Sequence, residues 1–137
     1  MSEKNEEMTQ YVVTQARNSD TGNPAYEAWE DANGKLDRPD GPAYREWRFD
    51  GKLIVEAWHR NDEYHRTDGP AVIRYSEDPS QSYKIEEWWQ RGRRHRDDGP
   101  AYVRYNYASG SVDVAEWWRN GQRIERKAMA PRTPGIP

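Results

Sequence analysis

The chain has 137 residues, enough for one ordinary domain. Its 33% of charged residues and its mean hydropathy of −1.34 are, taken alone, typical of disorder. Seven Trp, nine Tyr and one Phe indicate a folded chain instead, because each buried ring removes about 150–250 Å² from water, and the absence of cysteine excludes disulfides and any cysteine-based metal site or nucleophile.

The two ends of the chain are expected to lie outside the fold. Residues 1–9 are polar and acidic without an apolar run, so we expect a flexible lead, no signal peptide and no membrane-spanning segment. Residues 127–137 contain three prolines and are expected to be a disordered tail. One domain is therefore predicted at residues 10–126, with the cytoplasm as the expected location.

Two motifs recur inside this domain. Arg-x-Asp-Gly-Pro-Ala occurs at residues 66–71 and 96–101, each time after a histidine, and at 38–43 after an aspartate. Glu-x-Trp occurs four times, with its tryptophans taken as Trp29, Trp58, Trp89 and Trp118. A period of about 30 residues predicts an array of similar units, which we place at residues 10–39, 40–67, 68–97 and 98–126.

Each unit is expected to contain two strands. Segments rich in β-branched and aromatic residues, interrupted by polar residues at every second or third position, predict strands at 10–15, 43–49, 53–58, 71–75, 101–107 and 112–118. Type I′ turns are predicted at Asn33-Gly34, Asn61-Asp62, Arg91-Gly92 and Asn120-Gly121. The predicted fold class is all-β: four hairpin repeats in a twisted, curved antiparallel meander sheet.

The Asp-Gly-Pro step is interpreted as the corner that starts each new hairpin. Proline fixes φ and donates no hydrogen bond, which suits the first residue of a strand. Arg66 is expected to pair with Asp68 or with a nearby Glu. The residues assigned to this structural motif are Asp40, Gly41, Pro42, Asp68, Gly69, Pro70, Asp98, Gly99 and Pro100, together with Trp29, Trp58, Trp89 and Trp118.

In this register, Trp88 and Trp117 match Ala28 and Ala57 and point to the face opposite the other tryptophans. They are predicted to form a partner-binding surface with three basic residues of the neighbouring turn, namely Arg91, Arg93 and Arg94. Burial by a curled sheet or by a dimer is the alternative.

Catalysis and metal binding are not expected. His65 and His95 are one unit apart, about 10 Å in a flat array, which is too far to share an ion. His59 is expected on the surface. We therefore predict no catalytic residue, no metal site and no cofactor.

His-Arg-x-Asp-Gly-Pro-Ala together with Trp-x-x-Asn-Gly turns resembles the short β-hairpin repeats of bacterial and phage proteins, which are similar to MORN-type repeats and to the YwqK-type antitoxin family. The resemblance covers about residues 11–126, although Asp-Gly-Pro-Ala stands where MORN repeats have a different glycine pattern. It implies a single sheet of hairpins used for protein contacts.

The predicted function is a non-catalytic protein-binding module, a stoichiometric inhibitor such as an antitoxin, an immunity protein or a phage anti-defence protein of the anti-CRISPR kind. Its partner would be a toxin or a host defence effector, an inference that rests on fold-level analogy and size. A nucleic-acid binder using the Arg and Trp surface is the second prediction. A structural protein that assembles through its sheet edges is the third, and a homodimer through a sheet edge or the Trp face also stays open.

Overall fold

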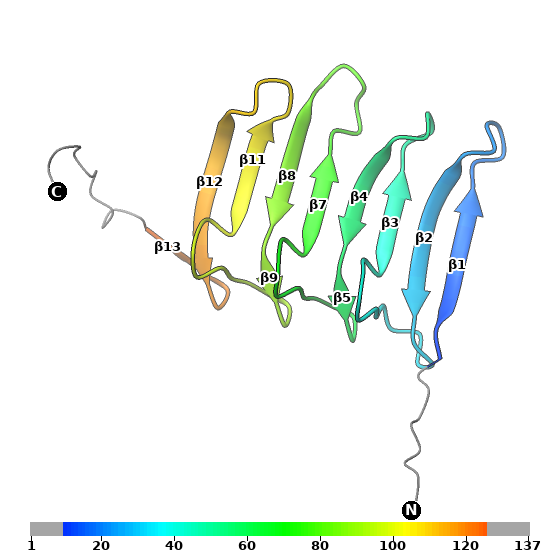
Figure 1. Ribbon diagram of the computed structural model, residues 1–137, viewed down its shortest axis with the longest axis horizontal. Helices are drawn as coiled ribbons and strands as arrows, with labels where there is room; N and C mark the ends of the chain where they lie inside the picture. The colour runs from blue at the N-terminus through cyan, green and yellow to red at the C-terminus, as the bar shows by residue number, and fades with distance from the viewer. Residues whose placement is uncertain (1–9, 126–137) are drawn as a thin grey trace, which may run out of the picture.

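The computed structural model describes residues 10–125, and the predicted lead and tail at 1–9 and 127–137 lie outside this range. The described chain forms thirteen strands and no helix, hence no helix suited to crossing a membrane. Nine strands make one antiparallel sheet in the order β1-β2-β3-β4-β7-β8-β11-β12-β13 (Figure 1). The predicted all-β class and antiparallel meander are confirmed.

The strands of the large sheet are β1 (Val12–Arg17), β2 (Pro24–Glu30), β3 (Tyr44–Trp47), β4 (Leu53–Ala57), β7 (Val72–Tyr75), β8 (Tyr83–Glu87), β11 (Tyr102–Asn106), β12 (Val112–Arg119) and β13 (Gln122–Ile124). Two short hairpins are separate two-stranded sheets, β5 (His59–Arg60) with β6 (Glu63–Tyr64), and β9 (Trp89–Gln90) with β10 (Arg93–Arg94). The first predicted strand begins two residues later than expected, at Val12.

Three of the four predicted type I′ turns are present. Both central residues have positive φ at Asn61-Asp62 (54° and 70°), Arg91-Gly92 (51° and 74°) and Asn120-Gly121 (49° and 81°). At Asn33-Gly34 only the glycine does, with φ 80°. The chain there makes a wider turn, closed by a bridge between Glu30 and Leu36, so the type I′ prediction is wrong at this position.

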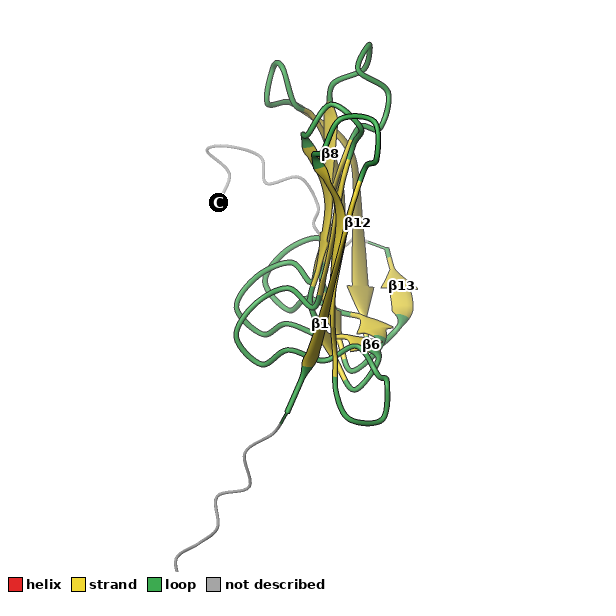
Figure 2. Ribbon diagram, turned by 90° about the vertical axis from the view of Figure 1, so that its right-hand side faces the viewer, coloured by secondary structure: helices red, strands yellow, loops and turns green. Residues whose placement is uncertain are grey.

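The sheet is a single layer whose lower half is covered on both sides. Figure 2 shows three loops bulging from one face, while β6 and β13 lie on the other. These loops, residues 37–43, 65–71 and 95–101, contain the Asp-Gly-Pro motif and are called the corners. We name the two sides the corner face and the short-hairpin face.

The small core lies in the lower half of the sheet, which is covered on both faces. Ala43, Ala71 and Ala101, which end the three corners, are each 0% exposed, and Val72 is the largest fully buried side chain. Alanine at these positions lets neighbouring strands approach closely. The upper half of the sheet has no comparable cover among residues 10–125, and its side chains are mostly half-buried.

The hydrogen bonds from Trp to the corners correct the sequence register. The backbone N–H of Trp29, Trp58 and Trp88 donates to Ala43, Ala71 and Ala101 respectively. Trp88, not Trp89, is therefore equivalent to Trp29 and Trp58. The Glu-x-Trp alignment was wrong by one residue in its last two copies. Trp88 and Trp89 both satisfy the pattern, because Glu86 and Glu87 are adjacent, whereas in the last copy only Trp118 satisfies it and the structurally equivalent Trp117 does not.

Candidate partner-binding surface

Each corner places an arginine over a tryptophan. The guanidinium carbon lies 3.9 Å from the ring centroid for Arg38 on Trp29, 3.9 Å for Arg66 on Trp58 and 3.8 Å for Arg96 on Trp88. At this distance the cation interacts with the π face of the ring. The tryptophans on the corner face are thus half-buried and already stacked on one side.

The same arginine fixes the shape of its corner. Arg66 donates from Nη1 to the Pro70 carbonyl at 3.0 Å and from Nε to Asp68 at 3.0 Å. A Cβ on Gly69 would lie 2.9 Å from the Arg66 guanidinium carbon, so a larger residue there would displace this group from its position. The predicted Arg66–Asp68 pair is confirmed, and the other two corners repeat the contact with Pro through Arg38 and Arg96.

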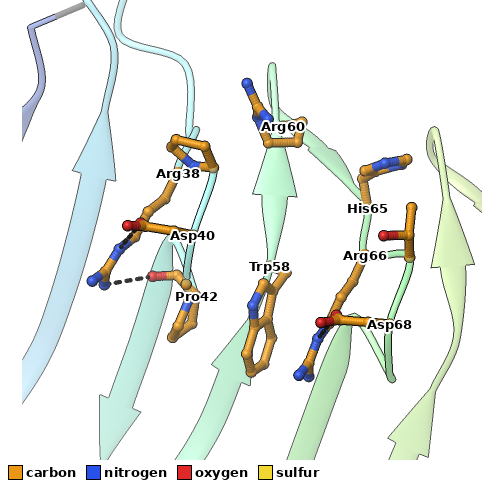
Figure 3. Close-up of a pocket in the computed structure, with 11 residues that line it drawn as sticks. Arg38, Asp40, Pro42, Trp58, Arg60, His65, Arg66 and Asp68 are labelled. Carbon is orange, nitrogen blue, oxygen red and sulfur yellow. Dashed lines mark hydrogen bonds and ion pairs between the residues drawn. The ribbon is translucent and has the colours of Figure 1, made fainter.

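Two clefts lie between successive corners. The first, about 600 Å³, is bounded by the corners that contain Asp40 and Asp68 and is lined by Trp58. Figure 3 shows Trp58 between these two corners. The second, about 480 Å³, is lined by the equivalent residue Trp88 and by Asp68 and Asp98. Two openings of the same design therefore follow each other along the corner face.

The rims of these clefts carry accessible carboxylates, and arginine side chains line both clefts beside them. The side chains of Asp40, Asp68 and Asp98 are 85%, 84% and 87% exposed. Such exposed pairs with arginine contribute little to stability, typically 0–1 kcal/mol. The carboxylates can therefore exchange their arginine for a basic group of a ligand at small cost to the fold.

A row of caps joins each corner to the next turn. Asp37 Oδ1 accepts from the Asn61 backbone at 2.8 Å, His65 Nδ1 from that of Arg91 at 3.0 Å, and His95 Nδ1 from that of Asn120 at 3.0 Å. An imidazole that accepts at Nδ1 has its proton on Nε2 when neutral. The repeated histidines are thus structural caps.

The first cap is the most enclosed. Asp37 also accepts from Arg60 Nε at 2.9 Å and from the Tyr11 hydroxyl at 2.9 Å. Burial alone would raise the pKa of Asp37, but these hydrogen bonds and that of Asn61 outweigh it and hold the pKa below its usual value.

Arg94 lies at the centre of a cluster on the short-hairpin face. Its guanidinium is 4.9 Å from the ring of Trp89, 5.1 Å from Tyr102 and 5.1 Å from Trp118. It also pairs with the carboxylate of Glu87 at 3.0 Å, which accepts the indole N–H of Trp89 at 3.0 Å. This arginine is an internal packing residue.

The structure separates the predicted site residues into two groups. Trp88 lies in a cleft of the corner face, whereas the exposed Arg91 and Arg93 lie in the β9–β10 hairpin of the short-hairpin face, where Arg94 is packed inside. Trp117 is equivalent to Trp88 in the corrected register. Residue 126, which follows Trp117 at the nine-residue spacing of Arg38 from Trp29, lies outside the described range.

Sequence reasoning assigned the corner aspartates a structural role only and missed the clefts that they border. The available signal was the fixed order of Trp, Arg and Asp. It also placed His59 on the surface, which is wrong: the residue, in β5, is 7% exposed and packs against the ring of Tyr64 in β6.

Comparisons with protein-family models, with curated proteins and with solved structures gave no match for this chain. Within residues 10–125, no group of three or more His, Cys, Asp or Glu side chains is arranged to hold a metal ion. The candidate site must therefore be interpreted from its own geometry.

Proposed function

We propose that the chain consists of four units of about 30 residues and is a non-catalytic, cytoplasmic binding module that inhibits a partner protein by stoichiometric association. The recurring Trp–Arg–Asp geometry supports the four-unit description. A chain without cysteine suits a reducing compartment. The observation that carries the functional proposal is the pair of equivalent clefts lined by Trp58 and Trp88.

The chemistry of the clefts indicates what kind of partner they accept. A partner side chain entering a cleft meets the half-buried edge of a tryptophan and an exposed carboxylate on the rim. Arginine and lysine combine an apolar stem with a cationic end, and so they match both features. Because the clefts are about 10 Å apart, an extended partner segment with two basic residues can fill both.

Charge reversal on the rims tests this proposal. Asp68→Lys with Asp98→Lys is expected to leave the fold intact and to abolish capture of the partner from a lysate of the native host. Asp20→Lys with Glu77→Lys makes the same change of charge in exposed loops away from the corners and should not affect capture. The purified partner should lose activity at a one-to-one ratio with the wild-type chain. Equal capture by both variants would refute the role of the clefts.

Nucleic-acid binding is the second candidate, supported by exposed basic residues in the β9–β10 hairpin, at the end of β12 and in β13, namely Arg91, Arg93, Arg119 and Arg123. Single-strand binding of this type also needs aromatic rings available for stacking. Here Trp89 and Trp118 are packed around Arg94, which favours a protein partner. Binding of labelled oligonucleotides at low salt, lost in Arg91→Glu with Arg93→Glu, would establish the second candidate instead.

A further inference from the structure

The large sheet ends on two open edges. At one end, the only described strand that pairs with β1 is β2. At the other end, β13 pairs with residues 117–119 of β12, so residues 112–116 have no strand on their outer side within the described part of the chain. Apolar side chains are exposed at both edges, including Val12 and Val13 on β1 and Val112 and Val114 on β12. Open edges of this kind are templates for pairing with another chain.

We propose that copies of this chain associate head to tail, with β12 of one copy pairing with β1 of the next and continuing the sheet. The occupant of each edge is thus a second copy of the chain. This inference does not depend on the proposed inhibitory function, because neither edge belongs to the corner clefts.

The direction of the strands fits this contact. The eight long strands alternate in direction, and their number is even, so β1 and β12 run antiparallel to each other (Figure 1). A second copy placed in line with the first brings its β1 antiparallel to β12. That is the relation between β4 and β7 and between β8 and β11 inside the molecule.

The joint between two neighbouring hairpins of the molecule, where strands such as β8 and β11 pair, also gives the register expected between two copies. Within their hairpins, Thr14 lies opposite Ala28 and Tyr102 lies opposite Glu116, so Thr14 and Tyr102 hold equivalent positions. At the joint between β8 and β11, Tyr102 lies opposite Glu87. The same joint between two copies places Thr14 of the next copy opposite Glu116.

This register matches apolar and charged groups across the contact. Counting along both strands from that pair, Val114 faces Ala16 of the next copy and Asp113 faces its Arg17. Directly opposed side chains of opposite charge stabilise antiparallel pairs. The charges of the open edges are Arg17 on β1 and Asp113 and Glu116 on β12. Contact of β12 with a second β12 would instead bring carboxylates together. This repulsion favours the head-to-tail contact of β12 with β1.

Disulfide trapping tests the register directly, because the chain has no cysteine of its own. The full-length Ala16→Cys, Val114→Cys double variant is expected to give a ladder of disulfide-linked oligomers on mild oxidation, since directly opposed Cβ atoms in sheets come within about 5 Å. Each single variant should remain monomeric on a non-reducing gel. A disulfide-linked dimer from one single variant would indicate a two-fold contact and overturn the proposal.

Blocking one edge at a time provides a second test by light scattering. The wild-type chain should grow in mass with concentration. Ala16→Lys and Val114→Lys each place a charge on one edge, so each alone should be monomeric, while their equimolar mixture should stop at a dimer. Circular dichroism would check that both variants stay folded. A wild-type chain that is monomeric at high concentration, or a mixture that does not dimerise, contradicts head-to-tail association.

Discussion

The two short hairpins β5–β6 and β9–β10 have the same backbone conformation, but their side chains pack in different ways. Both turn through two residues of positive φ, and both are capped by the preceding corner. In the first, buried His59 lies 4.9 Å from the Tyr64 ring. In the second, Trp89 and Arg94 take the equivalent places and join the Glu87 carboxylate.

The difference shows that one backbone frame accepts either a neutral aromatic contact or a charged cluster. The position of Glu87 is held by Ala57 in the first hairpin, so a carboxylate is present only where an arginine can reach it. A buried charge without a partner is costly. The second hairpin thus depends on an ion pair, while the first depends on a histidine that stays neutral.

Removing Arg94 should have the largest effect on stability. Arg94→Ala leaves the 9%-exposed side chain of Glu87 without its closest cationic partner and removes the contact with three rings. Breaking a pair of this kind costs about 3 kcal/mol. Urea denaturation followed by tryptophan fluorescence would measure the change in the free energy of unfolding.

Arg93→Ala is the matched control, because Arg93 is the exposed neighbour on the same strand. Its unfolding free energy should stay within about 0.5 kcal/mol of the wild type. Equal effects of the two substitutions would mean that the Arg94 cluster adds no stability beyond that of a surface arginine.

Acidification should destabilise the other short hairpin, β5–β6, which contains His59. Burial lowers the pKa of His59 from the ordinary value of 6.5, so the unfolded chain binds a proton there more readily than the folded protein. The stability that neutral His59 provides is fully present above the unfolded pKa and is lost as pH falls through and below 6.5. Unfolding free energies measured at about pH 7.5 and about pH 5 should therefore decrease on acidification.

His59→Phe separates this contribution from that of His65 and His95, which remain in the variant. The substitution keeps an aromatic ring against Tyr64 and removes the titrating group. Its loss of stability between the two pH values should be smaller than that of the wild type. An unchanged pH dependence would show that His59 is not its source.

Local signals were sufficient to predict much of the fold. The steps Asn61-Asp62, Arg91-Gly92 and Asn120-Gly121 placed the short turns, because asparagine and glycine adopt turn conformations largely independently of their surroundings. The strands followed from their composition. The structure has these elements within one or two residues at most positions.

The tertiary relations could not be predicted in the same way. Two adjacent tryptophans fit the Glu-x-Trp pattern equally well, and only the arginine resolves the register. The arginine that stacks on the tryptophan follows it by 38 − 29 = 9 residues in the first corner and by 66 − 58 = 8 in the second. In the third corner the distance from Trp88 is 96 − 88 = 8, which matches. The burial of His59 likewise depends on a hairpin folding back onto the sheet, which no local pattern indicates.

The caps provide the smallest and most specific prediction. Asp37 caps the turn of the first short hairpin and His65 that of the second, by accepting the same backbone N–H. His65→Leu removes the acceptor from a partly solvated N–H and should cost about 0.5–1 kcal/mol in unfolding free energy. His65→Asp should retain most of this stability, because aspartate performs the same role at position 37. If the leucine variant proved as stable as the wild type, water would be an adequate substitute for the cap. The coupling between corner and hairpin would then rest on neighbouring backbone hydrogen bonds, those from Gly92 to Tyr64 and from Arg66 to Trp89.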